Sequence, residues 1–125
     1  MTKIACIVSS TMVGVVLYSD IKDKLQEKDI ECEFNRKNLW IINKTDNWWL
    51  FISPIDSPMT INDTPFSFDY ICDNSLDDSI LGTNFGRYAY VRDKAKHIKG
   101  SLERRNPSMI NVSLDGLNEL IGVVL

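Results

Sequence analysis

The chain contains few side chains that could act as a nucleophile or a general base. Its single histidine, His97, is four residues from Asp93, the spacing of an ordinary surface pair on a helix. A catalytic triad or a multi-histidine metal site would have to be built around this one imidazole. Three widely spaced cysteines suit thiols in a reducing compartment better than disulfides. The sequence therefore predicts no catalytic residue, no metal site and no cofactor.

Charge is divided sharply along the chain, although the total is only −3. Residues 45–86 contain seven aspartates and no lysine, arginine or glutamate, whereas residues 87–105 carry a charge of +5. An acidic segment can be solvated surface, or it can steer a basic partner toward a binding site. Our hypothesis is that the acidic segment steers a basic partner toward this protein. The basic segment is then expected to face solvent and the chain's own acidic groups.

Three tryptophans lie in two short apolar segments, 39–42 and 48–52, which a polar turn joins into an expected hairpin. Trp48 and Trp49 must point to opposite faces of the sheet, so they cannot enter the same core layer. Either the hairpin is covered on both faces, which we favour, or one face awaits a partner. The residues predicted to bind a partner are Trp48, Trp49, Asp56, Asp63, Asp69, Asp73, Asp77 and Asp78.

The hydrophobic pattern predicts a single domain, residues 1–125, of the α+β class. A mixed, mainly antiparallel sheet with two or three helices packed on it is expected. On the first helix Leu17 and Ile21 should be buried, with Val16 beside them; on the second, Val91 and Ile98. Residues 114–125 fit either a helix or a strand. Strands are predicted at 3–8, 30–34, 39–42, 48–52, 66–72 and 109–113, and helices at 11–27 and from 87 to about 100, where Gly100 could fray the second helix.

Length and composition indicate one ordinary globular domain. The 125 residues are 44% hydrophobic and 25% charged, close to average usage. The apolar run from Ile4 to Leu17 is interrupted by Ser9-Ser10-Thr11 and is not followed by a small-residue cleavage site, so no secretory leader is expected. No stretch is long enough to span a membrane. A soluble, cytoplasmic protein is predicted.

Residues 3–33 resemble, in layout, the IIB phosphocarrier subunits of sugar phosphotransferase systems. In that family a strand, a phosphate-cradling loop and a helix start the chain, and a cysteine ends the strand and opens the loop. Here Cys6 lies two residues earlier, inside the apolar run, and the loop Ser9-Ser10-Thr11 has no glycine. The resemblance implies a small phosphocarrier enzyme as an alternative. The residues themselves predict a buried, structural Cys6.

Small size, an acidic pI near 5, reduced cysteines and the layout together resemble bacterial immunity proteins, most closely those of contact-dependent inhibition systems. This resemblance implies an intracellular protein that binds and neutralises a cognate toxin domain. A nucleic-acid-cutting toxin is expected, because enzymes that grip phosphates carry basic clefts. The partner is then a basic protein, with no direct contact to nucleic acid or membrane. A nucleic-acid-binding module that uses the basic helix 87–105 is a further alternative.

Overall fold

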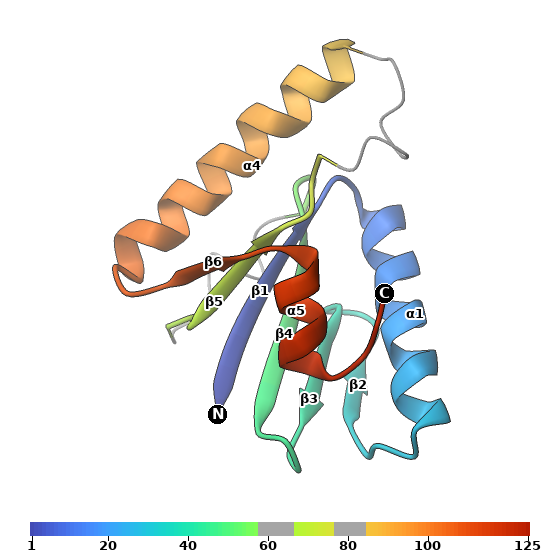
Figure 1. Cartoon of the computed structure of the whole chain (residues 1–125). Coiled ribbons are helices and arrows are strands. Elements are labelled where there is room, and N and C mark those ends of the chain that lie inside the picture. The colour runs from blue at the N-terminus through green and yellow to red at the C-terminus, as the bar shows by residue number, and fades with distance from the viewer. Residues whose placement is uncertain (58–66, 77–84) are drawn as a thin grey trace.

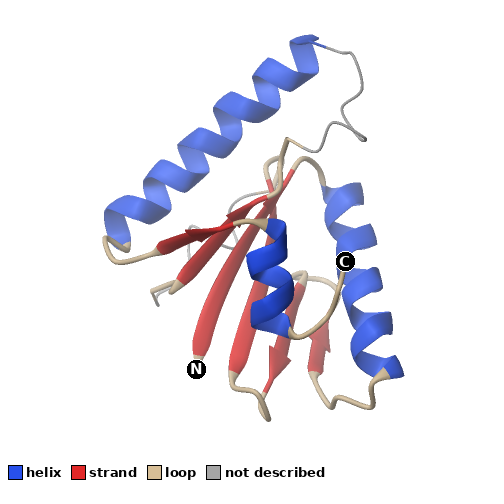
Figure 2. Ribbon diagram, viewed as in Figure 1, coloured by secondary structure: helices blue, strands red, loops and turns tan. Residues whose placement is uncertain are grey.

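The computed structural model describes residues 1–57, 67–76 and 85–125. Within these ranges a six-stranded sheet, in the order β2-β3-β4-β1-β5-β6, carries helices on both faces (Figures 1 and 2). None of the described helices is both long and apolar enough to cross a membrane. The elements are β1 Thr2–Val8, α1 Thr11–Glu27, β2 Glu33–Asn35, β3 Trp40–Asn43, β4 Trp48–Pro54, β5 Tyr70–Asp73, α4 Phe85–Arg105, β6 Ile110–Val112 and α5 Leu114–Ile121.

The sheet is mixed, and the predicted α+β class with helices packed on a mixed sheet is confirmed. β1 lies between β4 and β5 and runs parallel to both, and β6 runs parallel to β5. Antiparallel pairing, expected over most of the sheet, joins β3 to its neighbours β2 and β4. Within the described chain β3 thus runs against the other strands. The short turns 36–39 and 44–47 each force an antiparallel pair, whereas helices and long connections return the chain in parallel.

Helix α1 begins where the sequence predicts. The hydroxyl of Ser10 accepts a hydrogen bond from the Val13 N–H at 3.2 Å and caps the helix. Tyr18 and Ile21 are buried against the sheet, while Leu17 is only half-buried. Val16, expected on the apolar side, is 64% exposed, so the buried stripe is narrower than predicted.

Helix α4 packs on the opposite face of the sheet, with Val91 and Ile98 buried as predicted. It does not end or fray near Gly100, because Leu102 one half-turn later is also fully buried. The helix stops at Arg105. Asn106 closes it by donating its N–H and its side-chain amide to the Leu102 carbonyl, at 2.9 and 2.7 Å. Pro107 follows, as expected for a helix end.

Strands β2, β3 and β5 begin later than predicted. Ile30, the first apolar residue of the segment 30–34, donates its N–H to the Leu25 carbonyl just after α1 ends, and β2 is limited to Glu33–Asn35. Leu39 has a positive φ of 55°, and β3 therefore begins at Trp40. β5 covers Tyr70–Asp73; the predicted start at Phe66 lies outside the described residues.

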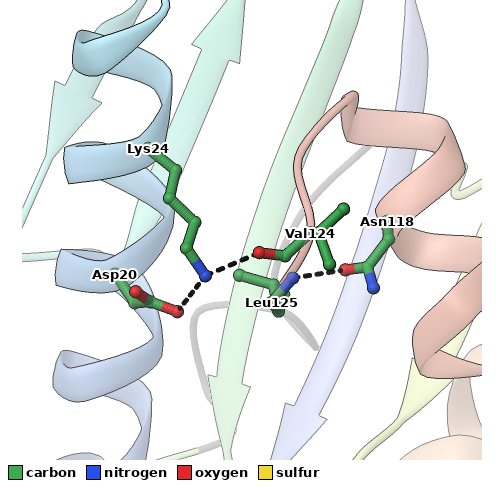
Figure 3. Close-up of polar contacts among 5 residues, drawn as sticks. All are labelled: Asp20, Lys24, Asn118, Val124 and Leu125. Atoms are coloured by element: carbon green, nitrogen blue, oxygen red, sulfur yellow. Dashed lines mark hydrogen bonds and ion pairs between the residues drawn. The ribbon is translucent and has the colours of Figure 1, made fainter.

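The C-terminal segment, which the sequence left open, forms the short helix α5. Ser113 caps its start, and Gly122, with φ of 74°, ends it in the left-handed conformation that glycine tolerates best. The last residues are held against α1 (Figure 3). Lys24 donates to the Val124 carbonyl at 2.6 Å, and Leu125 donates its N–H to the Asn118 side chain at 3.3 Å.

Two apolar cores lie on the two faces of the sheet. One is formed by α1, α5 and the alternate residues of β1 that include Ile4 and Cys6. The other core is formed by α4 and by Ala5 and Ile7, the residues of β1 that point to the opposite face. The central strand β1 is therefore covered on both faces, which explains its continuous apolar sequence.

Candidate functional site

The predicted acidic surface is not one patch among the described residues. Asp56 follows β4 and Asp73 is the last residue of β5, both at the carboxyl edge of the sheet, whereas Asp69 precedes β5 at the opposite, amino edge. All three are exposed. Asp63, Asp77 and Asp78 lie outside the described residues. Strand β5 therefore separates Asp69 from Asp73, although the two are only four positions apart in the chain.

Each described aspartate of the set also has a structural contact. Asp56 accepts hydrogen bonds from the hydroxyl of Thr11 at 2.9 Å and, at 3.4 Å, from its N–H at the start of α1. Asp69 accepts from the Lys3 N–H at 2.8 Å. Asp73 accepts from the N–H and the hydroxyl of Ser75. These contacts explain why aspartate suits these turns, and they leave the exposed carboxylates with further acceptor sites.

The two adjacent tryptophans take different environments, as alternation predicts. Trp48 is 3% exposed and lies in the core under α1 and α5. Trp49 is half-buried on the α4 side of the sheet, so it is the tryptophan of the pair that reaches the surface. The preferred prediction of a fully covered hairpin is therefore only partly correct.

Trp49 belongs to an aromatic strip across β3 and β4. Its ring lies 5.0 Å from that of Trp40 and 4.7 Å from that of Phe51, centroid to centroid. Trp40 is also half-buried, whereas Phe51 is buried and contacts Phe68 edge-on. We call Trp40, Trp49 and Phe51 the aromatic strip. Sequence analysis missed Trp40 as a site residue, because only the strand register places it beside Phe51.

The register also brings together one predicted aspartate and one predicted tryptophan. Trp49 on β4 is the register partner of Lys3 on β1. On the other side of β1, Asp69 donates its N–H to the Lys3 carbonyl at 2.8 Å and accepts the Lys3 N–H through its carboxylate. With strands about 4.8 Å apart, Trp49 and Asp69 are roughly 10 Å from each other. An aromatic ring and a carboxylate thus flank the same end of β1.

A hollow of about 550 Å³ opens at this amino edge of the sheet. Asp69 lines it, and Arg105 and Asn106 contribute from the end of α4. Asn106 is buried and accepts the Phe68 N–H at 2.8 Å, which fixes the chain just before Asp69. The hollow therefore has a rigid wall on one side and an exposed carboxylate on the other. Thr2 and Asn47 add further polar groups to its lining.

The cysteine required by the phosphocarrier alternative is sealed in the core. Cys6 is 0% exposed and is the register partner of Cys72, which is 1% exposed. A hydrogen bond to Cys72, and then burial, raise the pKa of the Cys6 thiol well above its ordinary value. The same hydrogen bond lowers the pKa of Cys72. The prediction of a shielded Cys6 is confirmed.

The loop that would cradle phosphate is occupied by the chain itself. Ser9 is buried, and its carbonyl accepts a hydrogen bond from Arg87 at 3.0 Å. Ser10 caps α1, and Asp56 lies at Thr11. The carboxylate of Asp56 therefore lies at the helix N-terminus, where the phosphocarrier subunits would bind phosphate. The described loop therefore departs from the phosphocarrier arrangement.

The remaining chemistry-bearing groups do not form a catalytic set within the described chain. His97 is exposed on α4 and makes no hydrogen bond to any described residue, its helical neighbour Asp93 included. No group of three His, Cys, Asp or Glu side chains that could hold a metal ion occurs among the described residues. No known protein family matches this chain, and no curated protein or solved structure is detectably similar to it.

Proposed function

We propose that this chain is an inhibitor of the immunity-protein kind, which binds a cognate toxin domain inside the cell and blocks it. The observation behind this proposal is the juxtaposition of the half-buried Trp49 and the exposed Asp69 on two sides of Lys3, with Asp69 also lining the hollow of about 550 Å³. Tryptophan is enriched at protein interfaces, where polar and charged groups form the rim.

The two parts of this surface have different roles in binding. A lysine or arginine of the partner enters the hollow and forms a charge-assisted hydrogen bond with Asp69, whose carboxylate has acceptor sites beyond the one used by Lys3. The accessible parts of Trp49 and Trp40 offer an apolar area to the partner's main chain. The carboxylate supports a high association rate, and the rings support slow dissociation.

A basic partner is favoured by the charge of residues 45–86, which is −7. A toxin that cleaves nucleic acid meets this requirement, because its substrate is a polyanion and its cleft is basic. The inhibitor then covers or fills that cleft. A binding role also agrees with the burial of Cys6 and with the contact between Asp56 and Thr11, because the cysteine that the phosphocarrier alternative requires is not accessible.

The first test is whether a toxin gene lies immediately upstream of the gene for this chain, and neutralisation is then tested with the domain that such a gene encodes. Co-expression with the unchanged chain should restore growth, and calorimetry should give a tight complex. Trp49→Ala should weaken the complex about 30-fold, as expected for loss of a hot-spot tryptophan worth about 2 kcal/mol. Tyr88→Ala is the matched control, because Tyr88 is an exposed aromatic residue on α4. Failure to bind or neutralise that domain, or equal losses in the two variants, would overturn the proposal.

A further inference from the structure

The outer face of α4 is rich in charged side chains. The residues that α4 buries, Val91, Ala95, Ile98 and Leu102, recur every three or four positions and form one stripe against the sheet. The charged residues of this helix consequently lie on its flanks and outer side. Figure 1 shows α4 alone on its side of the sheet, apart from α1 and α5.

Basic side chains form two rows along this face. Arg92, Lys96 and Lys99 are spaced by four and three positions, so they lie in one row. Lys94 and Arg104 belong to the other flank. The helix carries a net charge of +5 over its 21 residues, a length of about 31 Å. Such a face is long enough to contact several phosphates.

Part of this charge is not matched by an ion pair within residues 1–57, 67–76 and 85–125. Lys96, Lys99 and Arg104 make no ion pair with any described residue. Arg92 contacts its neighbour Asp93 at 3.4 Å, with both side chains largely exposed, and such a pair contributes at most about 1 kcal/mol. The sequence-based expectation that this face pairs with the chain's own acids therefore does not hold for these three side chains within the described chain.

Aromatic rings lie among the cations. Tyr90 is 45% exposed, with the Arg87 guanidinium 5.2 Å and the Lys94 ammonium 5.8 Å from its ring centroid. Tyr88 is also exposed, at 36%. Cations that hold a phosphate backbone and rings that stack on bases are the two components of single-stranded nucleic acid sites.

We propose that the outer face of α4 binds single-stranded nucleic acid, with the lysines on the phosphates and Tyr90 stacked on an unpaired base. A single strand is favoured over a duplex because the bases of a duplex are already stacked and cannot cover a tyrosine ring. The carboxylate of Asp93 lies between the two basic rows and would repel the dense phosphates of a duplex. This surface is separate from the aromatic strip, so the inference does not depend on the proposed function.

Binding is tested by fluorescence anisotropy of the full chain with a 15-nucleotide oligouridine, the matching DNA strand and a 15-base-pair RNA duplex. Both single strands should bind at 50 mM salt more tightly than the duplex. If four phosphates are contacted, affinity should fall about 50-fold between 50 and 200 mM salt. Absence of binding to all three probes at 50 mM salt, or tighter binding to the duplex, would overturn the inference.

Two variants with the same change in net charge locate the site. Lys94→Glu with Lys96→Glu should reduce oligouridine binding at least 20-fold. Arg36→Glu with Lys37→Glu, at exposed positions between β2 and β3, should change it less than 3-fold. Tyr90→Ala should weaken single-strand binding about 10-fold, consistent with the loss of one stacked base, and leave any duplex binding unchanged. Equal effects of the two double variants would mean that only overall charge matters and that α4 is not the site.

Discussion

Asp69 and Trp49 contact the same residue of β1 from opposite sides. Trp49 is the register partner of Lys3, and Asp69 exchanges two hydrogen bonds with the Lys3 backbone, both 2.8 Å long. An indole from β4 and a carboxylate from the start of β5 are thereby fixed at one edge of the sheet. Their positions depend on main-chain pairing, so substitutions of either side chain can test binding without removing the strand.

Neutralising Asp69 should slow association with the toxin domain, whereas neutralising Asp73 should not. Asp69→Asn keeps an oxygen that can accept the Lys3 N–H, so the fold is retained while the charge is lost. Asp73→Asn makes the same chemical change at the other end of β5. We expect the association rate of the first variant to fall about 3- to 10-fold at low salt, with the difference shrinking as salt rises. Stopped-flow fluorescence measures both rates; equal rates for the two variants would contradict our assignment of Asp69.

The adjacent tryptophans should differ in their contribution to stability. Trp48 is almost fully buried, and Trp48→Ala should lower the free energy of unfolding by about 3–5 kcal/mol. Trp49→Ala should cost clearly less, about 1–2 kcal/mol, because this ring is only partly buried in the folded chain. Urea denaturation followed by circular dichroism gives both values. A larger loss for Trp49 would show that its face is covered in solution.

The rate at which each cysteine is labelled should depend on its burial and on the pKa of its thiol. Cys32 is the one half-buried cysteine, and burial, with a smaller effect of Asp46, raises its pKa to about 11. Below that pH the neutral thiol dominates, so its rate with a disulfide reagent should rise about 10-fold per pH unit from pH 8 to 10. Cys6 and Cys72 should react only at the rate of unfolding. Mass spectrometry of the labelled sites checks this order, and rapid native labelling of Cys6 would revive the phosphocarrier alternative.

Replacing either of two glycines by alanine should change the stability of the fold, in opposite directions for the two positions. A Cβ at Gly14 would lie 3.0 Å from a methyl carbon of Leu39 and 3.3 Å from Pro54 and Val8, so Gly14→Ala should destabilise the fold by about 1–3 kcal/mol. A Cβ at Gly100 would meet only the end of the Arg104 side chain, at 3.7 Å. Gly100→Ala should therefore stabilise α4 by about 0.5–1 kcal/mol. Thermal unfolding distinguishes the two, and a destabilised Gly100→Ala would mean that the outer face of α4 is not open.

The sequence by itself determined the local structure and the direction of several side chains. Apolar spacings of three and four predicted α1 and α4, and strict alternation placed Trp48 and Trp49 on opposite faces. The position of Cys6 within an apolar run predicted its burial. These properties follow from the fixed periods of helix and strand, which depend only on neighbours in the chain.

Only the tertiary structure decided which distant residues meet. Strand order placed Asp69 beside Lys3 and Trp49 but moved Asp73 to the other edge, and register set Trp40 against Phe51. Because Leu102 is buried against the sheet, α4 continues beyond Gly100. These outcomes result from many weak long-range contacts that are satisfied together, and no single segment encodes them. The chain's charge pattern was visible in its sequence, but the fold alone distributed the described aspartates over two edges and left basic side chains on both flanks of α4.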